Sequence, residues 1–393
     1  MLSDEIIQKV KETAPVLAEQ GVKITDIFYE KLFFNHPELK NIFNMANQAQ
    51  GEQSKALAES VFMYASHIDQ LEYLTPMVKR IAHKHASLNI LPEHYPIVGK
   101  YLLEAIKEYL GLEANDPLLE AWALAYDALA SIFISVEEEI YAENENKLGG
   151  WRGFKPFLID QVVEEAEGVK SFYLLPEDKQ MVSFKAGQYV GVKTKPANDG
   201  YDEIRQYSLS NAPGDDFYRI TVKAENRNTV PAGVVSNYLH SAKVGDAVWL
   251  QPPTGDFVLK DSFHSKVFIA GGVGITPVLS MLLNELRYFD SEQITFIQCC
   301  RDKKHHIMEK ELRTLQENYG FKYYVSYEFD DGGNHRGYLT KDVLKKWLPE
   351  DEADVYFCGP KMFMSEVNRL CQALGYEEHQ LHYEVFGPTT KLS

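Results

Sequence analysis

Two histidines, His83 and His85, lie in one segment whose apolar residues recur at helical spacing, residues 74–88. Positions two residues apart are about 200° apart around a helix, so the two imidazoles cannot face the same way. His85 lies on the apolar stripe, and His83 points away from it. A histidine on a buried face is usually a hydrogen-bonded core residue. The alternative for one imidazole in this place is to bind the iron of a haem as its axial ligand.

A glycine-rich run, Gly271-Gly-Val-Gly-Ile-Thr-Pro277, follows a compact apolar stretch and precedes residues with helical spacing. A strand, a glycine loop and a helix in this order are typical of a loop that binds nucleotide phosphates. The run departs from the GxGxxG pattern, because Pro277 takes its last position. Proline in a first helical turn is preorganised and loses no hydrogen-bond donor that the helix needs.

The elements that would position these residues change character near residue 150. Before it, apolar residues recur every three or four positions, which predicts helices. After it, short β-branched and aromatic runs dominate, and one of them, Tyr218–Lys223, alternates strictly and predicts a half-buried strand. From about residue 263, strand and helix patterns alternate, which predicts a parallel sheet covered on both faces.

The chain is therefore predicted to have several domains. We expect an all-α domain over residues 1–147, an antiparallel β-barrel over residues 152–258 and an α/β domain with a parallel sheet over residues 263–393. Gly149 and Gly150 would end the last helix of the first domain and start a linker.

Composition and charge exclude several functions. With 45% hydrophobic and 25% charged residues the chain is an ordinary globular protein, and its net charge of −17 disfavours nucleic acids and anionic membranes as partners. Four cysteines without a CxxC pair indicate neither a disulfide scaffold nor a zinc site of that type. The N-terminus lacks an apolar signal region, and no uncharged apolar run of about 18 residues appears. We therefore expect a cytoplasmic protein without a transmembrane segment.

Five residues of the first domain carry a family resemblance. Tyr29, Phe43 and Gln53 fall on earlier segments than His85, and Leu57 follows Gln53 by one helical turn. Together they resemble the haem pocket of globins, and in particular the globin domain of flavohaemoglobins. The resemblance implies that His85 binds iron, that Phe43 packs on the porphyrin, and that the other three line the distal side. Taken singly, Tyr29 could be a core tyrosine bonded elsewhere and Gln53 an exposed helix-start residue.

Glu137 lies on the apolar stripe of the last helical segment of this domain. A buried carboxylate needs a partner, because burying an unpaired charge is costly. The resemblance implies that it accepts the Nδ1–H of His85, with Tyr95 nearby, and so makes the imidazole a stronger donor to iron. The alternative is that Glu137 belongs to a solvated run of three glutamates. We expect the other two, Glu138 and Glu139, to face water.

The β-rich part contains Arg205-Gln206-Tyr207-Ser208, which fits the pattern RxYS. Through this motif the second and third domains resemble the ferredoxin–NADP reductase superfamily, which implies FAD as a cofactor. Arg205 would meet the flavin pyrophosphate as a fixed cation. Tyr207 would lie on a face of the isoalloxazine ring, and Ser208 would hydrogen-bond near its N5.

Other segments flank this motif in the order of the superfamily. Tyr189, in Gly187-Gln-Tyr189, lies upstream, and Pro253-Thr-Gly-Asp-Phe257 matches the usual end of the barrel. Between them a second phosphate loop would open a helix whose first amides bind phosphate. That loop consists of Gly233, Val234, Val235 and Ser236. An ordinary turn or strand is the alternative for each segment.

The superfamily's own phosphate loop has the form GxGxTP and implies a site for the pyrophosphate of NADH or NADPH. Its positions here are Gly272, Gly274, Thr276 and Pro277. Basic residues at 301, 303 and 304 follow the next predicted strand, where a 2′-phosphate would be bound and NADPH favoured. A solvated basic loop is the alternative, so the choice between NADH and NADPH stays open.

Two segments near the C-terminus complete the resemblance. Cys358-Gly359-Pro360 ends the last apolar strand and resembles the part of the superfamily that touches the nicotinamide. The thiol alone would be interpreted as a buried small apolar residue. Phe386, within Glu384-Val-Phe-Gly-Pro388, is implied to cover the flavin ring until nicotinamide displaces it.

The resemblance covers residues 2 to 390 and implies an activity. NAD(P)H, FAD and haem b would serve the conversion of nitric oxide and O2 to nitrate by a monomeric nitric oxide dioxygenase. Two alternatives remain: an oxygen-binding or sensing globin whose reductase keeps haem ferrous, and a general NAD(P)H:acceptor flavin reductase. Anaerobic reduction of nitric oxide would use the same site and cannot be separated by sequence.

Overall fold

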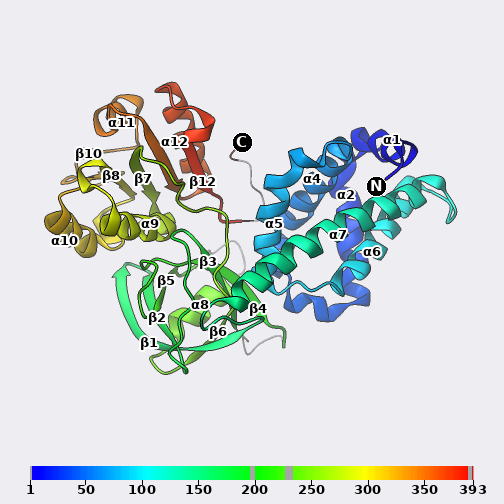
Figure 1. The fold of residues 1–393 in the computed structure, drawn as a ribbon, viewed down its shortest axis with the longest axis horizontal. Helices are drawn as coiled ribbons and strands as arrows, with labels where there is room; N and C mark the ends of the chain where they lie inside the picture. The colour runs from blue at the N-terminus through cyan, green and yellow to red at the C-terminus, as the bar shows by residue number, and fades with distance from the viewer. Residues whose placement is uncertain (1, 195–199, 226–232, 388–391, 393) are drawn as a thin grey trace.

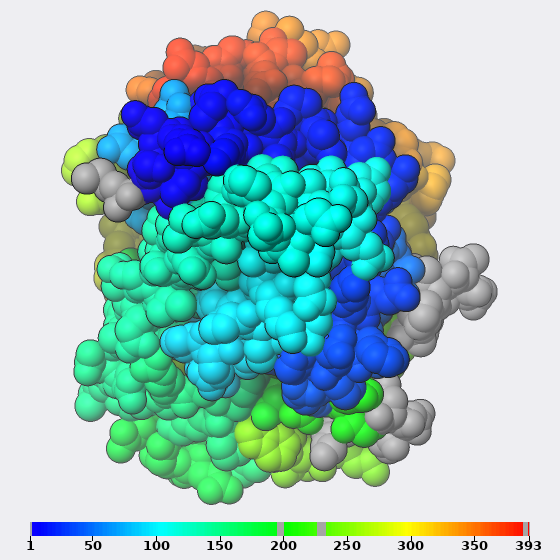
Figure 2. Space-filling model, turned by 90° about the vertical axis from the view of Figure 1, so that its right-hand side faces the viewer, coloured from blue at the N-terminus to red at the C-terminus, as the bar shows by residue number. Residues whose placement is uncertain are grey.

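The computed structural model describes residues 2–194, 200–225, 233–387 and 392 of the chain. Figure 1 shows a helical body from the first part of the chain on one side and two β-containing bodies on the other. Seen from the helical side, the first domain fills the front face, with residues of the second domain below it and of the third above it (Figure 2). The last described strand ends beside helix α5 (Thr75–Leu88), so the C-terminal segment returns to the first domain.

The first domain is built from helices, as predicted. In chain order they are α1 (Asp4–Glu12), α2 (Ala14–Asn35), η1 (Pro37–Asn41), α3 (Met45–Ala49), α4 (Glu52–His67), η2 (Leu71–Leu74), α5, α6 (His94–Leu110) and α7 (Pro117–Asn146). Prolines lie in the first turns of α2, α5 and α7, where no hydrogen-bond donor is lost.

Helices α2 and α4 cross closely in this domain. A Cβ added to Gly21 would lie 3.2 Å from the Cβ of Ala58, so the two small residues allow the approach. The Thr25 hydroxyl donates to the carbonyl of Ser54 at 2.9 Å and fixes the crossing. Tyr29 follows Thr25 by one helical turn. The crossing therefore fixes the part of α2 that carries Tyr29.

Among the described residues, one helix, α7, is long and apolar enough to cross a membrane by length and composition alone. Its buried Trp122 and Phe133 belong to the core of the first domain, and its carboxylate Glu137 is 2% exposed. These contacts are those of a core helix packed in a globular domain.

The second domain is a six-stranded antiparallel sheet of order β4-β3-β6-β1-β2-β5. Its elements are β1 (Lys155–Ala166), β2 (Val169–Pro176), β3 (Tyr189–Thr194), β4 (Glu203–Ser208), β5 (Tyr218–Lys223), the helix α8 (Val234–Ser241) and β6 (Ala247–Leu250). A bridge between Leu209 and Ile220 joins the ends of the two edge strands, as a barrel requires.

One strand prediction for this domain was wrong in its burial. The segment 218–223 is strand β5, but all its residues except Lys223 are buried. The polar face, with Arg219 and Thr221, is covered because Arg219 pairs with a residue of the third domain and Thr221 bonds to Ser171. Alternation therefore identified the strand but not the domain that packs on it.

The third domain is a six-stranded sheet of order β10-β9-β8-β7-β11-β12 in which every pairing is parallel. Its strands are β7 (Ser265–Gly271), β8 (Ile294–Cys300), β9 (Lys322–Tyr327), β10 (His335–Arg336), β11 (Ala353–Cys358) and β12 (Leu381–Glu384). Its helices are η3 (Gly272–Gly274), α9 (Ile275–Tyr288), η4 (Ser291–Gln293), η5 (Lys303–His305), α10 (Glu309–Tyr319), α11 (Lys341–Trp347), α12 (Lys361–Ala373) and η6 (Glu378–Gln380). The predicted fold class is confirmed.

The link between the first two domains is tied to α7. Gly149 has φ +73°, and a Cβ on Gly150 would lie 2.3 Å from the carbonyl of Asn144, so both positions favour glycine. Beyond them, Arg152 pairs with Glu138 and lies 4.8 Å from the centre of the Tyr141 ring. Both partners lie on α7, so the chain that leaves this helix is held against it.

Candidate functional site

Three side chains from three helices meet at His85. Glu137 Oε1 of α7 lies 2.6 Å from His85 Nδ1, and the hydroxyl of Tyr95, on α6, donates to the same oxygen at 2.6 Å. Glu137 is 2% exposed, and these two hydrogen bonds supply the partners that a buried carboxylate needs. Burial and the neighbouring carboxylate raise the pKa of Tyr95, which keeps its hydroxyl a donor. Glu138 and Glu139 are exposed, as predicted.

Further tyrosines hold the segment between α5 and α6. Tyr126 donates to the carbonyl of Tyr95 at 2.7 Å, and Tyr141 donates to the carbonyl of Ile90 at 2.7 Å. A Cβ on Gly99 would lie 2.4 Å from the Tyr126 ring, so glycine lets this ring lie on α6. The backbone around Tyr95 is thereby fixed from α7, which also carries Glu137.

The side chains expected on the distal side of the pocket come from α2 and α4, and Phe43, expected to pack on the porphyrin, lies just before α3. The rings of Tyr29 and Phe43 meet edge to face with centroids 5.8 Å apart. The Tyr29 hydroxyl has no hydrogen-bond partner among the described residues, and burial raises its pKa. Gln53 begins α4 half-buried, its Oε1 buried and without a partner in the described chain. Leu57 packs on the same core.

This set of residues fits a haem. His85 Nδ1 is engaged by Glu137, which leaves Nε2 as the nitrogen for a metal. No cluster of three or more metal-ligating side chains occurs in the described ranges. Leaving a buried polar group unpaired costs about 1–3 kcal/mol, and a bound group with a polar ligand would offset that cost at Gln53.

The other face of α5 contacts the second domain. His83 Nδ1 lies 2.6 Å from the Thr254 hydroxyl and accepts the backbone N–H of Gly255 at 3.3 Å. Because an amide can only donate, this nitrogen carries no proton, and burial lowers the pKa of His83 accordingly. The sequence placed His83 off the apolar stripe but gave it no role.

A backbone contact next to His83 needs a glycine. A Cβ on Gly191, in β3, would lie 1.9 Å from the carbonyl oxygen of Ser87 at the end of α5. Gln206, within the RxYS motif, donates to the Ser87 hydroxyl at 3.1 Å. The helix that carries His85 is thus in direct contact with β3 and β4, the two strands that carry the proposed flavin residues.

The C-terminal segment closes the junction of the three domains. Lys84 donates to the carbonyl of Gly387, and burial lowers the pKa of its amine. Burial and the charge of Asp256 raise the pKa of Glu384 to about 8. Phe386, in the same segment, is 48% exposed, and Pro388 of the predicted ending lies outside the described residues.

The predicted flavin residues line up on β3 and β4. Tyr189 and Ser208 are directly opposite in the antiparallel register, and Val190 is opposite Tyr207. Arg205 lies in β4 and pairs with Glu203 at 2.8 Å. Burial raises the pKa of both tyrosines.

The second phosphate loop begins α8. Gly233 is the residue before the helix, and a Cβ there would lie 2.5 Å from the Ser236 hydroxyl. Ser236 donates to the carbonyl of Gly233 at 3.1 Å, and Val235 is buried in the barrel core. Val234 is the first residue of the helix, so the first amides of α8 follow Gly233 directly.

The glycine loop of the third domain lies between β7 and α9, as predicted. Gly272 has φ +55° with open space where a Cβ would be, and a Cβ on Gly274 would lie 2.3 Å from the carbonyl of Cys358. Thr276 donates to the carbonyl of Val273 at 3.1 Å, and Pro277 is buried in the first turn of α9. The structure therefore brings this loop and the end of β11 together.

The residues that end β11 are held tightly. A Cβ on Gly359 would lie 2.7 Å from the Phe363 ring, and Pro360 precedes α12. Cys358 donates to the carbonyl of Glu384 at 3.4 Å, and burial raises the pKa of its thiol. The thiol is therefore a buried donor and not a nucleophile.

The basic residues after β8 already have acidic neighbours. Arg301 pairs with Asp302 at 3.1 Å, and the backbone N–H of Lys303 donates to Asp330 at 2.8 Å. Hydrogen bonds from His305 and Arg301 lower the pKa of Asp302 to about 2, which keeps it ionised. A cation and an ionised carboxylate therefore lie side by side directly after β8.

Sequence reasoning missed several residues of the junctions. Gly191 and Ser87 gave no signal, since a close backbone contact between domains leaves no pattern in one sequence. The strict alternation around Arg219 suggested an exposed arginine, whereas its side chain is 5% exposed.

Comparisons with known proteins agree with this architecture. Three sequence families match the chain: Globin over residues 26–133, Oxidoreductase FAD-binding domain over residues 159–259 and Oxidoreductase NAD-binding domain over residues 268–369. The chain is 45% identical to a flavohemoprotein of Oceanobacillus iheyensis, with 99% of this chain and 97% of that protein covered. It is 41% identical to flavohemoprotein A of Dictyostelium discoideum, with both covered in full.

Two solved structures carry the comparison further. The flavohemoglobin of Malassezia yamatoensis, determined with bound FAD and heme, superposes with a TM-score of 0.85 at 28% identity, over 98% of this chain and 100% of that one. The FAD/NAD-binding domain of the nitric oxide dioxygenase of Vibrio cholerae matches at 36% identity and a TM-score of 0.56, over 60% of this chain and all of that one. The chain belongs to the flavohaemoprotein family, oxidoreductases in which a globin domain for haem is joined to FAD- and NAD-binding domains.

Proposed function

We propose that the protein is a nitric oxide dioxygenase that consumes NADH or NADPH and converts nitric oxide and O2 to nitrate. One observation carries this proposal: α5 presents His85 to the proposed haem pocket and His83, two residues earlier, to Thr254, which is bridged to Tyr189 at the start of β3. The dinucleotide, FAD and haem, when bound, would supply the chemistry, since flavin accepts a hydride and releases single electrons. Two similarities support the assignment: a relative over nearly the whole chain is a flavohemoprotein, and one similar solved structure is a domain of a nitric oxide dioxygenase.

The residues around His85 would set the electron donation of its imidazole. The Glu137 carboxylate would accept a hydrogen bond from the Nδ1–H of His85. This bond would fix the tautomer of the imidazole and leave Nε2 as the ligand atom. Tyr95 donates to the same carboxylate oxygen and keeps it in place. A carboxylate-bonded imidazole is a stronger base, and a stronger base donates more charge to a bound metal.

On the opposite side, Tyr29 and Gln53 would bind the gaseous ligand. The phenol keeps its proton because burial raises its pKa, so it can donate a hydrogen bond to a partly negative oxygen. Gln53 supplies an amide as a second polar group, while Leu57 and Phe43 exclude water. Charge developing on an oxygen here would thus meet a donor that is already in place.

The remaining residue assignments are part of the same proposal. Arg205, Tyr207, Ser208 and Tyr189, with Gln206 beside them, would hold FAD together with the loop Gly233–Ser236. Gly272, Gly274, Thr276, Pro277 and the segment Cys358–Pro360 would hold the dinucleotide, and Phe386 would cover the flavin. We assign the domains to residues 1–147, 152–258 and 263–393, and we place the protein in the cytoplasm as a monomer, consistent with its four free cysteines.

His85→Ala in the purified holoenzyme tests this function. We expect loss of the haem absorption band and of nitric oxide consumption, while NADH still reduces the flavin and a chemical acceptor. His67→Ala, in the same domain, is the control and should keep both activities. Undiminished nitric oxide consumption by His85→Ala would refute the assignment. Nitric oxide consumption by the wild-type protein that leaves NADH unoxidised would favour an oxygen-binding globin.

A further inference from the structure

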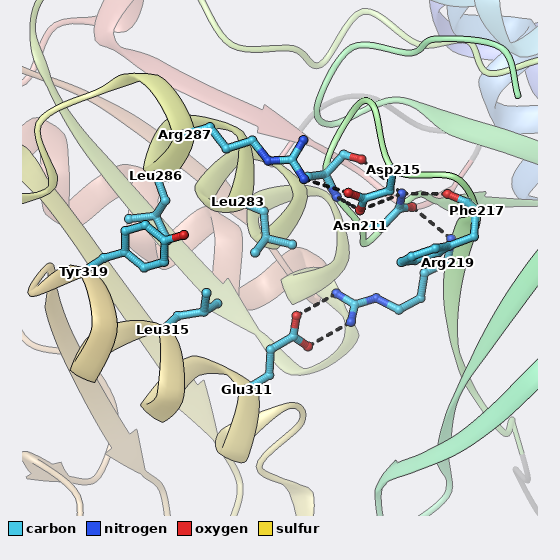
Figure 3. A pocket seen from close by; sticks show the side chains of 11 residues that line it. Asn211, Asp215, Phe217, Arg219, Leu283, Leu286, Arg287, Glu311, Leu315 and Tyr319 are labelled. Carbon is cyan, nitrogen blue, oxygen red and sulfur yellow. Dashed lines mark hydrogen bonds and ion pairs between the residues drawn. The ribbon is translucent and has the colours of Figure 1, made fainter.

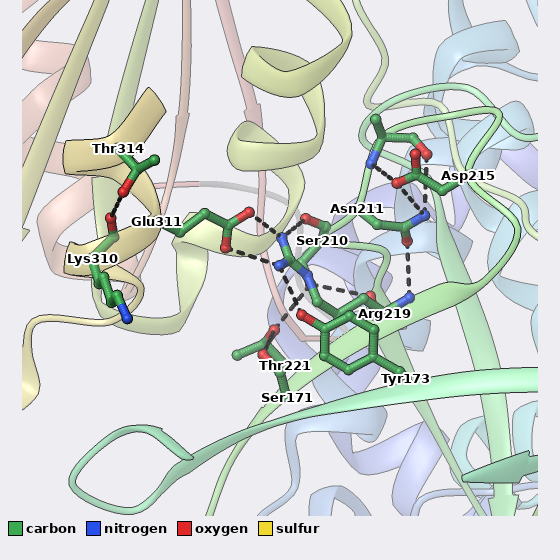
Figure 4. Close-up of polar contacts among 11 residues, drawn as sticks. Ser171, Tyr173, Ser210, Asn211, Asp215, Arg219, Thr221, Lys310, Glu311 and Thr314 are labelled. Carbon is green, nitrogen blue, oxygen red and sulfur yellow. Dashed lines mark hydrogen bonds and ion pairs between the residues drawn. The ribbon is translucent and has the colours of Figure 1, made fainter. Parts of the chain in front are cut away.

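A bidentate ion pair joins the second domain to the third. Arg219, on β5, binds both carboxylate oxygens of Glu311, in the first turn of α10, at 2.9 and 3.2 Å (Figures 3 and 4). The Arg219 side chain is 5% exposed and that of Glu311 31%. Two parallel hydrogen bonds fix an orientation as well as a distance. The first turn of a helix also favours a carboxylate, so Glu311 is held from its own domain as well.

Arg219 is anchored on its own domain before it reaches across. It donates to the carbonyl and hydroxyl of Ser210 at 2.5 and 3.1 Å, and to the Tyr173 hydroxyl at 3.4 Å (Figure 4). The guanidinium cannot turn without breaking several of these bonds. Removing Glu311 would leave a buried charge without its bidentate counter-ion, which is strongly unfavourable.

The segment between β4 and β5, residues 209–217, forms a firm docking loop. Asn211, 1% exposed, donates to the carbonyl of Phe217 at 2.9 Å and accepts the backbone N–H of Arg219 at 2.9 Å. The loop starts directly after Ser208 of the RxYS motif. Its position is therefore coupled to the strand that carries the proposed flavin residues.

The third domain touches this docking loop through the helix that follows its glycine loop. On α9, Ser280 donates to the carbonyl of Asn211 at 2.7 Å. Arg287, at the other end of α9, donates to the carbonyl of Pro213 and to Asp215, each at 2.6 Å (Figure 3). The flavin domain is thus tied to the middle and the end of α9, and through Glu311 to the first turn of α10.

Apolar packing between these contacts is incomplete. A cavity of about 200 Å³ lies at the interface, bordered by Leu283, Leu286 and Leu315 of the third domain and Phe217 of the docking loop (Figure 3). Polar contacts therefore surround this pocket, while Val169, Ala186 and Phe257 of the second domain join the apolar core of the third domain elsewhere.

We propose that Arg219 and Glu311 form an interdomain clamp that fixes the dinucleotide-binding domain at the distance and angle needed to reduce the flavin. The two are positioning residues: they act through the docking of domains and touch no reacting atom. The proposal rests on the proposed electron route, in which a hydride, two electrons with one proton, leaves the nicotinamide and is taken up by the flavin. It concerns this first transfer and leaves the later ones unaffected.

The test compares Glu311→Gln with Glu317→Gln in the holoenzyme. Both remove one negative charge from α10, but Glu317 is exposed in its last turn. After anaerobic mixing with NADH, flavin bleaching should be about tenfold slower in Glu311→Gln than in the wild type, which corresponds to about 1.4 kcal/mol of activation free energy. The affinity for NADH should stay within about twofold of the wild-type value. Backbone amides of residues 209–217 and the start of α10 should exchange hydrogen about tenfold faster. Glu317→Gln should match the wild type in all three measurements.

Arg219→Lys keeps the charge but cannot form the two-pronged contact, so it should fall between the wild type and Glu311→Gln. Wild-type bleaching and exchange in Glu311→Gln would overturn the clamp. Faster exchange with wild-type bleaching would also overturn it, because the pair would then only stabilise the fold. A wild-type protein that bleaches its flavin normally yet forms no nitrate would refute the proposed function and leave the clamp intact.

Discussion

The second domain is held by its two neighbours in different ways. Against the globin domain it makes neutral hydrogen bonds and a close backbone approach, with His83 on Thr254 and Gly191 on Ser87. Two partly exposed ion pairs, Arg152 with Glu138 and Arg80 with Asp256, accompany these contacts. Against the third domain it uses a bidentate ion pair and half-exposed charges around a cavity. The haem side therefore has a backbone contact that admits only glycine, whereas the dinucleotide side has a buried bidentate ion pair. A contact based on charge can be weakened by salt or a single substitution without a steric clash.

The two interfaces serve different proposed electron transfers, from flavin to haem and from the dinucleotide to flavin. On the haem side, His83 and His85 are two residues apart on α5, so movement of the interface would move the proposed iron ligand, His85. On the dinucleotide side, a soluble cofactor has to enter and leave, and an interface of hydrogen-bonded charges leaves the domains separable. We expect substitutions on the two sides to slow different steps.

Gly191→Ala should have the largest effect on the haem side. The added Cβ would lie 1.9 Å from the Ser87 carbonyl, so backbone must shift and the two domains must separate. Overpacking of this kind costs about 1–3 kcal/mol, and if that cost is relieved by separating the domains, haem reduction should slow by about 5- to 160-fold. Rapid mixing with NADH should show flavin bleaching as in the wild type and a delayed change of the haem band. Gly387→Ala, where a Cβ meets open space, is the control, and equal haem reduction in both variants would contradict a shape-fixed interface.

The dinucleotide side should be sensitive to acid. His306, just before α10, is 3% exposed and bonds Tyr327 and Gln298 at 2.6 and 3.0 Å, and burial lowers its pKa to about 4. The unfolded chain binds a proton near pH 6.5 and the folded one does not, so stability falls as pH drops from about 6.5 toward 4. We expect the third domain to lose about 2 kcal/mol between pH 7 and pH 5.

Hydrogen exchange in β8 and β9 measures this loss. His306→Gln should remove most of the pH dependence, whereas His379→Gln, at an exposed histidine, should keep it. An unchanged pH dependence in His306→Gln would mean that other groups destabilise the domain in acid.

Glu137→Gln tests the other face of α5. The amide cannot draw the His85 proton as a carboxylate does, so the iron–histidine stretching frequency should drop and nitric oxide consumption should fall about tenfold. Flavin reduction by NADH should not change, which distinguishes this site from the clamp. Glu139→Gln, an exposed position on the same helix, is the matched control. A wild-type stretching frequency in Glu137→Gln would show that the carboxylate does not polarise the imidazole.

The smallest effect is expected for Asp215→Asn. Its ion pair with Arg287 is partly exposed, and such pairs contribute about 0.5 kcal/mol or less. Flavin bleaching should slow by no more than about twofold. In the double variant Asp215→Asn/Glu311→Gln, the loss of activation free energy for flavin bleaching should exceed the sum of the two single-variant losses if both contacts hold one docking loop. A loss equal to that sum would show that the two contacts act independently.

The sequence predicted most of what lies within a domain. The apolar stripe of α7 placed Glu137 on the buried face, and the strand–glycine–helix order located the loop at Gly271–Pro277. Both depend on local periodicity, which a single sequence displays. The family resemblance supplied the partner of Glu137, which the structure places at His85.

Contacts between domains were beyond sequence reasoning. Arg219 looked like an outward residue of a half-buried strand, because alternation reveals one apolar face and says nothing about a polar face that another domain covers. Glu311 was given no role by the sequence. Their partnership depends on how two folded domains dock, and no local pattern encodes that.

The ratio of nitrate formed to NADH oxidised tests the central claim most directly. Nitric oxide and O2 together need one electron to become nitrate, and NADH supplies two, so the account predicts about two nitrates per NADH. The measurement uses the purified holoenzyme in air-saturated buffer with limiting nitric oxide. Nitrate formation at this ratio, lost in His85→Ala, is the predicted result. NADH oxidation that leaves nitric oxide unconsumed, or nitrate formed equally well without His85, would contradict the account.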